Sequence, residues 1–226
     1  MMDEFQVGDR TARGYVALPT GATGPGPGVL VLHAWWGLTE QFTRMCDRLA
    51  DAGFVAFAPD LYDGPTATTI TDAERLMGAS DETRARAIAV AAVARLRAHP
   101  AVQAGPIGAV GFSLGAGWAF ELSALRPDDI AAVVAFYGTV DGPDFATARA
   151  AYLGHFAAHD QFEPLASVRT LEEQIRAAGR DIAFHSYPGT THWFVEDNRP
   201  DAYDTAAAAL AWERTVAFLR RALAGA

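Results

Sequence analysis

Apolar runs alternate with segments of helical periodicity along the whole chain. The runs at residues 28–33 and 54–58 and at Ile107–Phe112 are almost entirely apolar, which is typical of strands buried on both faces. Alternating strands and helices predict an α/β fold with a mostly parallel, twisted sheet and helices on both faces. Further strands are predicted at residues 14–18, 131–137, 152–157 and, nearer the sheet edge, 182–187, and helices at residues 39–51, 71–77, 81–97, 114–125, 167–178 and 202–223.

Composition narrows the choice of protein class. The chain has 226 residues, of which 50% are hydrophobic, and it shows no internal repeat or linker, so we expect one domain over residues 1–226. A net charge of −9 disfavours nucleic acid and anionic membranes as partners. The N-terminus lacks a signal-peptide pattern and no apolar run approaches the ~20 residues of a membrane span, so a soluble cytoplasmic protein is expected.

The rare residue types exclude several kinds of chemistry. All 18 basic residues are arginine, so no lysine is present to form a Schiff base or to bind phosphate in a P-loop. The single cysteine, Cys46, can form neither an intramolecular disulfide nor a cysteine-based zinc cluster. We expect no metal and no organic cofactor. The oligomeric state, monomer or homodimer, is left open.

The clearest chemical motif is Gly111-Phe112-Ser113-Leu114-Gly115, which matches G-x-S-x-G. It lies between a predicted buried strand and a predicted helix, the context in which this motif forms a nucleophile elbow. The sharp turn strains the serine backbone, and the glycines leave room for it. A helix N-terminus at the serine stabilises developing negative charge. Ser113 is therefore the candidate nucleophile.

A serine nucleophile needs a base, and the base needs a carboxylate to orient it. In this architecture the order along the chain is Ser, acid, His. His192 follows the last predicted strand and is the candidate base, and Asp160 directly follows the strand before it and is the candidate acid. The rival acids are Glu163, read as a first-turn helix residue, and Asp141 and Asp144, read as turn formers. The remaining histidines are read as packing or surface residues.

The loop after the first buried strand supplies the rest of the predicted site. The oxyanion hole is expected to combine the N–H of Leu114, just after the nucleophile, with that of Trp35. The adjacent tryptophans Trp35 and Trp36 are expected to form a wall of an apolar pocket. Other residues expected to contact the substrate are Trp193, Phe194 and Glu196.

These residues resemble the dienelactone hydrolases, a small α/β-hydrolase family without a large lid. The likeness extends over nearly the whole chain. It includes the HAWWGL loop at residues 33–38, the PDLY turn at 59–62, the elbow at Ser113, the DQFEP loop at 160–164, the GTTHWF loop at 189–194 and the WERTVAFL helix at 212–219. The resemblance implies a triad of Ser113, Asp160 and His192, with Leu114 and Trp35 as oxyanion donors.

Two departures from the family pattern bear on the substrate. The usual nucleophile is a cysteine, often accompanied by a glutamate in the first loop, whereas this chain has Ser113 and Ala34. Where the namesake enzyme has an arginine that helps to hold the substrate carboxylate, this chain has Glu196. We expect Glu196 to lie near the mouth of the site and to disfavour anionic substrates, unless Arg75 or Arg199 compensates.

The leading interpretation is a serine hydrolase that cleaves small carboxylic esters or lactones through an acyl-enzyme. Three alternatives stay open. The first is a true dienelactone hydrolase (carboxymethylenebutenolidase) of aromatic degradation, and the second is a hydrolase of a C–C or thioester bond. The third is a non-catalytic binding protein on the same scaffold, which the complete Ser, Asp, His set argues against.

Overall fold

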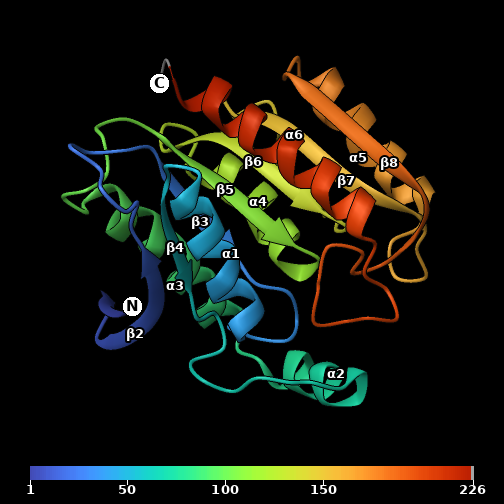
Figure 1. Cartoon of the computed structure of the whole chain (residues 1–226), viewed down its shortest axis with the longest axis horizontal. Coiled ribbons are helices and arrows are strands. Elements are labelled where there is room, and N and C mark those ends of the chain that lie inside the picture. The colour runs from blue at the N-terminus through green and yellow to red at the C-terminus, as the bar shows by residue number, and fades with distance from the viewer. Residues whose placement is uncertain (225–226) are drawn as a thin grey trace.

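One mixed sheet organises the molecule (Figure 1). The computed structural model describes residues 1–224, and in that part of the chain eight strands lie in the order β1-β2-β4-β3-β5-β6-β7-β8. β1 and β2 pair antiparallel, β2 also pairs antiparallel with β4, and all other neighbours are parallel. The strands are β1 Met2–Val7, β2 Arg10–Ala17, β3 Gly28–Leu32, β4 Val55–Pro59, β5 Ile107–Phe112, β6 Ile130–Phe136, β7 Ala151–His159 and β8 Ile182–Thr191.

Helices cover both faces of the sheet, as the alternating pattern predicts. α1 (Glu40–Asp51) and α6 (Thr205–Leu223) pack on one face, and α3 (Glu82–Arg97), α4 (Leu114–Leu125) and α5 (Leu165–Ala177) pack on the other. The remaining helix within residues 1–224 is α2 (Ile70–Ala79). Its only buried residue is Ala73, and it projects from the rest of the molecule (Figure 1). The predicted fold class is confirmed.

The elements differ from the sequence prediction at several places, and three of these differences have a clear physical reason. β1 was not predicted, because its two buried apolar residues, Phe5 and Val7, alternate with polar residues in an acidic segment. β8 continues to Thr191 rather than ending at residue 187, because a register shift lets its last residues pair with β7. α6 begins at Thr205 instead of residue 202, where the Asp204 side chain accepts the Ala207 N–H at 2.8 Å and caps the helix.

The parallel strands bring the site together. β3, β5, β6, β7 and β8 run in the same direction, so the loops that follow them meet at one edge of the sheet. The strand interiors are buried, and the rings of Phe112 and Phe136 stack at 4.8 Å across β5 and β6 just before those loops. No helix within residues 1–224 is both long and apolar enough to cross a bilayer.

Candidate active site

Ser113 sits at the turn between β5 and α4, as the motif predicts. Its backbone has φ 51° and ψ −117°, a conformation that L-residues rarely adopt. The turn is possible because its glycines lack side chains. A Cβ on Gly111 would overlap the carbonyl of Gly115, and a Cβ on Gly115 would overlap the carbonyl of Leu32. The Ser113 N–H donates to the Phe136 carbonyl at 2.9 Å, which ties the elbow to the end of β6.

His192 lies directly beyond β8, with its side chain only 4% exposed. Its Nε2 is 3.2 Å from the Ser113 hydroxyl oxygen, and its Nδ1 is 2.7 Å from Oδ2 of Asp160. The carboxylate can only accept, so Nδ1 carries the proton and Nε2 is left to accept from the serine hydroxyl. The structure therefore brings the three predicted residues into one hydrogen-bonded chain in the order that general-base chemistry requires.

Asp160 comes directly after β7 and its side chain is 2% exposed. The oxygen that does not face His192, Oδ1, accepts the backbone N–H groups of Phe162 at 2.9 Å and Glu163 at 3.0 Å. These bonds hold the carboxylate in one orientation, so that Oδ2 points at the imidazole. Asp160 is thus a buried, fully oriented acceptor, the state in which a carboxylate best controls a histidine tautomer.

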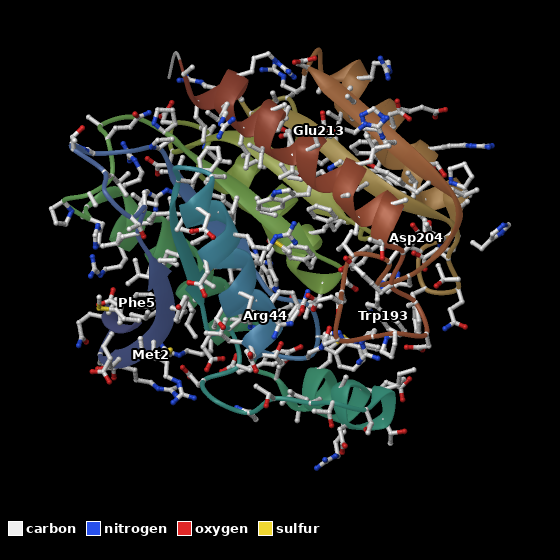
Figure 2. All side chains as sticks on the ribbon, viewed as in Figure 1. Met2, Phe5, Arg44, Trp193, Asp204 and Glu213 are labelled. Carbon is white, nitrogen blue, oxygen red and sulfur yellow. The ribbon has the colours of Figure 1, made fainter. Side chains whose placement is uncertain are left out.

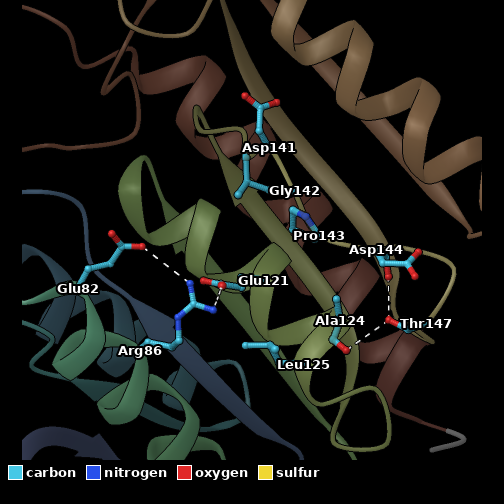
Figure 3. A pocket seen from close by; sticks show the side chains of 11 residues that line it. Glu82, Arg86, Glu121, Ala124, Leu125, Asp141, Gly142, Pro143, Asp144 and Thr147 are labelled. Carbon is cyan, nitrogen blue, oxygen red and sulfur yellow. Dashed lines mark hydrogen bonds and ion pairs between the residues drawn. The ribbon is translucent and has the colours of Figure 1, made fainter.

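The rival carboxylates lie elsewhere. Glu163 precedes α5 and accepts the Thr139 hydroxyl at 2.6 Å and its N–H at 2.8 Å, so it links the loops after β6 and β7. Burial raises the pKa of Glu163, and its bonds to Thr139 oppose the rise. Asp141 and Asp144 line a cavity of about 540 Å³ between α3, α4 and the loop after β6 (Figure 3). That cavity is lined by none of the three triad residues.

The predicted oxyanion donors lie at the elbow and at the loop after β3. In residues 1–224 no backbone hydrogen bond uses the N–H of Leu114 or of Trp35. The first turn of α4 lies against the end of β3, since Gly115 approaches the carbonyls of Leu32 and His33 closely. The two loops that carry these amides are therefore neighbours, and neither N–H donates to a backbone carbonyl of the described residues.

An aromatic cluster lies beside His192. Trp35 packs on Phe162 with ring centroids 5.5 Å apart, and Phe162 in turn lies 5.0 Å from the His192 ring and 5.1 Å from Trp193. Phe162 is 38% exposed, so it forms the solvent side of this cluster. Trp36 and Phe194, which we expected to contact substrate, are 3% and 0% exposed. Trp36 packs on Trp35 and Trp193, and Phe194 packs on Tyr137 and Tyr187. A small cavity of about 220 Å³ adjoins His192 and Trp193.

The expected position of Glu196 is wrong. Its side chain is 1% exposed and lies in the protein interior rather than at the mouth of the site. Oε1 accepts the hydroxyl of Tyr137 at 2.9 Å, and Oε2 is 3.6 Å from Nε of Arg199. A carboxylate with two such partners can be buried, which the sequence did not reveal because Tyr137 is distant along the chain. Arg75 forms an exposed pair with Asp72 on α2.

The loop that carries Glu196 runs from the end of β8 to Asp204 and includes Trp193 (Figure 2). It is tied to α1 by Arg44, whose guanidinium lies 2.8 Å from Asp197. The guanidinium carbon of Arg199 lies 3.5 Å from the ring centroid of Trp36 and 4.7 Å from that of Trp193. Arg199 therefore fills the space between two tryptophans instead of extending into solvent.

Three other residues with reactive side chains, His33, His155 and Cys46, are buried parts of the packed interior. His33 Nδ1 donates to the Ala34 carbonyl at 2.7 Å and Nε2 accepts the Leu61 N–H at 3.1 Å. His155 is buried between Tyr187 and Thr215, and burial lowers its pKa well below the usual value. Burial also raises the pKa of the Cys46 thiol. Among residues 1–224 no three His, Cys, Asp or Glu side chains come together as a metal site.

Sequence reasoning missed two residues that contact His192. Phe162 lies within the loop that supplied Asp160, and Tyr137 directly follows β6. Both stand just beyond the carboxyl end of a strand, the position where chemistry concentrates in such sheets. That signal would have found them if it had been applied to every strand rather than only to those expected to carry the triad.

The fold and site define a hydrolase of the α/β-hydrolase class. A sequence model of the dienelactone hydrolase family matches residues 12–223, and the chain belongs to that family. It is 35% identical over 230 residues to "Protein usf" of Aquifex pyrophilus, with 98% of each chain covered. It is 34% identical over 230 residues to a "Putative carboxymethylenebutenolidase" of Aquifex aeolicus, with 97% of each covered.

Solved structures show the same architecture. The dienelactone hydrolase-like promiscuous phosphotriesterase P91 from metagenomic libraries superposes with a TM-score of 0.88 at 23% identity, and 98% of each chain is covered. A thermophilic esterase of Thermogutta terrifontis superposes with a TM-score of 0.73 at 16% identity, over 98% of this chain and 91% of that one. At these identities the likeness establishes the fold.

Proposed function

We propose that this hydrolase cleaves small carboxylic esters or lactones through a serine acyl-enzyme. The observation that carries the proposal is the continuous chain from the Ser113 hydroxyl to His192 Nε2 at 3.2 Å and from His192 Nδ1 to Asp160 at 2.7 Å. His192 can accept the proton of the Ser113 hydroxyl, and Asp160 accepts the N–H on the other side of the imidazole, as nucleophilic catalysis requires.

The reaction follows from this geometry. Ser113 attacks the substrate carbonyl as His192 takes the hydroxyl proton, and Asp160 stabilises the resulting imidazolium. The N–H groups of Leu114 and Trp35 receive the oxyanion, with the α4 dipole adding to their effect. His192 returns the proton to the leaving alcohol. Water then enters, gives a proton to His192 and attacks the acyl carbonyl; the bond to the Ser113 oxygen breaks, and His192 returns the proton to that oxygen. When the substrate is a lactone, the alcohol and the acid stay in one molecule.

The expectation that neutral esters are preferred rested on Glu196 at the mouth of the site, and its burial beside Arg199 removes that ground. A true dienelactone hydrolase is therefore kept as the alternative, supported by the name of the relative from Aquifex aeolicus.

The test is a panel of neutral and anionic esters and lactones, assayed with the wild type and Ser113→Ala. The variant should lose at least about 10³-fold in kcat, retaining only what binding and the oxyanion donors supply. EDTA should leave the rate unchanged. An organophosphonate should label the wild type on Ser113 and leave the variant unlabelled. Full activity of Ser113→Ala, or no labelling, would contradict the mechanism and favour a binding protein.

A further inference from the structure

Backbone strain is concentrated around His192. Of the four non-glycine residues in the described part of the chain with positive φ, three adjoin the imidazole: Ser113 at 51°, Tyr137 at 38° and Trp193 at 67°. Such conformations persist only where the surroundings impose them, and they gather at functional sites. The elbow accounts for Ser113. Tyr137 and Trp193 require a different explanation. Both are connected to the side chain of Glu196.

Tyr137 contacts His192 with its ring and Glu196 with its hydroxyl. It directly follows β6, and its N–H donates to the His155 carbonyl at 2.8 Å. The phenol ring is fully buried, with its centroid 4.8 Å from that of the imidazole. The hydroxyl donates to Oε1 of Glu196 at 2.9 Å. Rotation of the ring away from His192 would break this bond and leave a buried carboxylate with one partner fewer.

Trp193, which follows His192 in the chain, is connected both to the backbone of Glu196 and, through Arg199, to its carboxylate. The Glu196 N–H donates to the Trp193 carbonyl at 2.8 Å, which closes a turn. Oε2 of Glu196 faces Nε of Arg199 at 3.6 Å, and the Arg199 guanidinium covers the Trp193 ring. Glu196 is thus connected to Tyr137, which contacts the His192 ring, and to Trp193, which follows His192 in the chain.

We propose that Glu196 is a positioning residue for His192. Its carboxylate holds Tyr137 against one side of the imidazole and, through Arg199, holds Trp193 in its strained conformation, so that Nε2 stays in reach of the Ser113 hydroxyl. This inference rests on the proposed function, because it assigns Glu196 a part in the same reaction. Such a device suits a base carried at the end of β8, which is one of the two edge strands of the sheet in the described part of the chain.

The electrostatics of the cluster make its charge sensitive to pH. Burial raises the pKa of Glu196 to about 7, and the adjacent charge of Asp197 adds to the rise. The Tyr137 hydroxyl, the Arg199 charge and the Trp36 indole oppose it. Burial and the charges of Glu196 and Asp160 raise the pKa of Tyr137, so the phenol stays protonated and able to donate. Arg199 therefore faces a full charge only above the pKa of Glu196.

The test compares Glu196→Gln, Tyr137→Phe and a matched control. Glutamine keeps the size of the side chain and removes its charge, and phenylalanine keeps the ring and removes the hydroxyl. The control is Asp129→Asn. Asp129 is another buried carboxylate with arginine partners, Arg97 and Arg126, but it lies before the first residue of β6, at the opposite end of that strand. Steady-state kinetics on a neutral ester would be measured from pH 5 to pH 9, with circular dichroism for folding.

In both site variants kcat should fall on the order of 10- to 100-fold, as expected for a displaced catalytic group, while KM stays within about threefold. In the wild type, log kcat/KM should fall more steeply as pH drops below 7 than it does in Glu196→Gln, because Glu196, with a pKa of about 7, gains a proton in that range. The glutamine variant lacks this group and should lose that part of the slope. In Tyr137→Phe the steep region should move to higher pH, since a donor to the charged form is lost. Asp129→Asn should keep the wild-type kcat and slope even if it melts earlier.

The outcomes distinguish a failure of the proposed function from a failure of the positioning role of Glu196. Activity in Ser113→Ala overturns the proposed function and this inference with it. If Ser113→Ala is inactive while folded Glu196→Gln and Tyr137→Phe keep the wild-type kcat and slope, only the positioning role is overturned. An equal loss in Asp129→Asn also overturns it, because general destabilisation would then suffice. If Glu196→Gln does not fold, Tyr137→Phe, which leaves the ion pair intact, decides the question.

Discussion

Asp160 and His192 meet because the residues just before them, His159 and Thr191, are paired across β7 and β8. The register of two parallel strands therefore sets the 2.7 Å contact between Oδ2 and Nδ1. Ser113, in contrast, follows β5 in the middle of the sheet. The geometry of the site thus depends on how the edge strand β8 and its loop are held relative to the centre.

Replacement of Asp160 by asparagine should lower kcat by roughly 10²- to 10⁴-fold, because the amide no longer holds the imidazole in the tautomer that accepts from Ser113. The matched comparison is Glu163→Gln, in which the carboxylate three residues along is neutralised. That variant should cost stability through the lost contacts with Thr139 and leave most of kcat. A silent Asp160→Asn together with an inactive Glu163→Gln would mean that the acid is misassigned.

Removal of the exposed ring of Phe162 should broaden substrate choice. This ring packs on Trp35, His192 and Trp193 at the solvent side of the site. Phe162→Ala opens space there, so the ratio of kcat/KM for a long-chain to a short-chain ester should rise about tenfold, the scale of a change in one apolar contact. The measurement is a series of p-nitrophenyl esters of increasing acyl length, and an unchanged ratio would place the acyl pocket elsewhere.

The rate should rise smoothly with substrate through the solubility limit of an ester, without interfacial activation. A lipase-type lid needs a long insertion over the site. The segment between β6 and β7 instead buries Phe145 against Phe120 and Tyr152, beside α4. A sharp increase in rate on formation of an ester emulsion, measured by titration of released acid, would show that a segment does close over Ser113.

The buried carboxylate of Glu196 should make the wild type lose stability as pH rises. Its folded-state pKa of about 7 lies above the ordinary value of 4.5, so between these pH values the folded state binds more protons than the unfolded state. This contribution is present below pH 4.5 and is lost as pH rises through 7, by up to about 3 kcal/mol.

Glu196→Gln stays neutral and should not show that loss. The difference in unfolding free energy between this variant and the wild type should therefore shift in favour of the variant between pH 5 and pH 8. Urea denaturation at the two pH values measures it. The same difference at both values would mean that Glu196 ionises at an ordinary pKa. A variant that is more stable at pH 8 and yet slower would fit a residue retained for positioning rather than for stability.

The amino-acid sequence by itself determined the features that depend on local pattern. The elbow at Ser113 requires two glycines and a strand followed by a helix, all of which are contiguous in the chain. Asp160 and His192 were found from their order and from their place just after predicted strands. The fold class followed from alternation of apolar runs and helical segments, because each element must bury its own apolar face.

Only the tertiary structure decided what surrounds His192. The weak alternation in β1 becomes a strand because β2 offers it a partner. Glu196 looks like a surface residue in a polar segment, yet it is buried because Tyr137, 59 residues earlier, donates a hydrogen bond to it and Arg199 faces it between two tryptophans. Burial of a charge depends on partners, and partners distant along the chain are chosen by the packing of the whole fold.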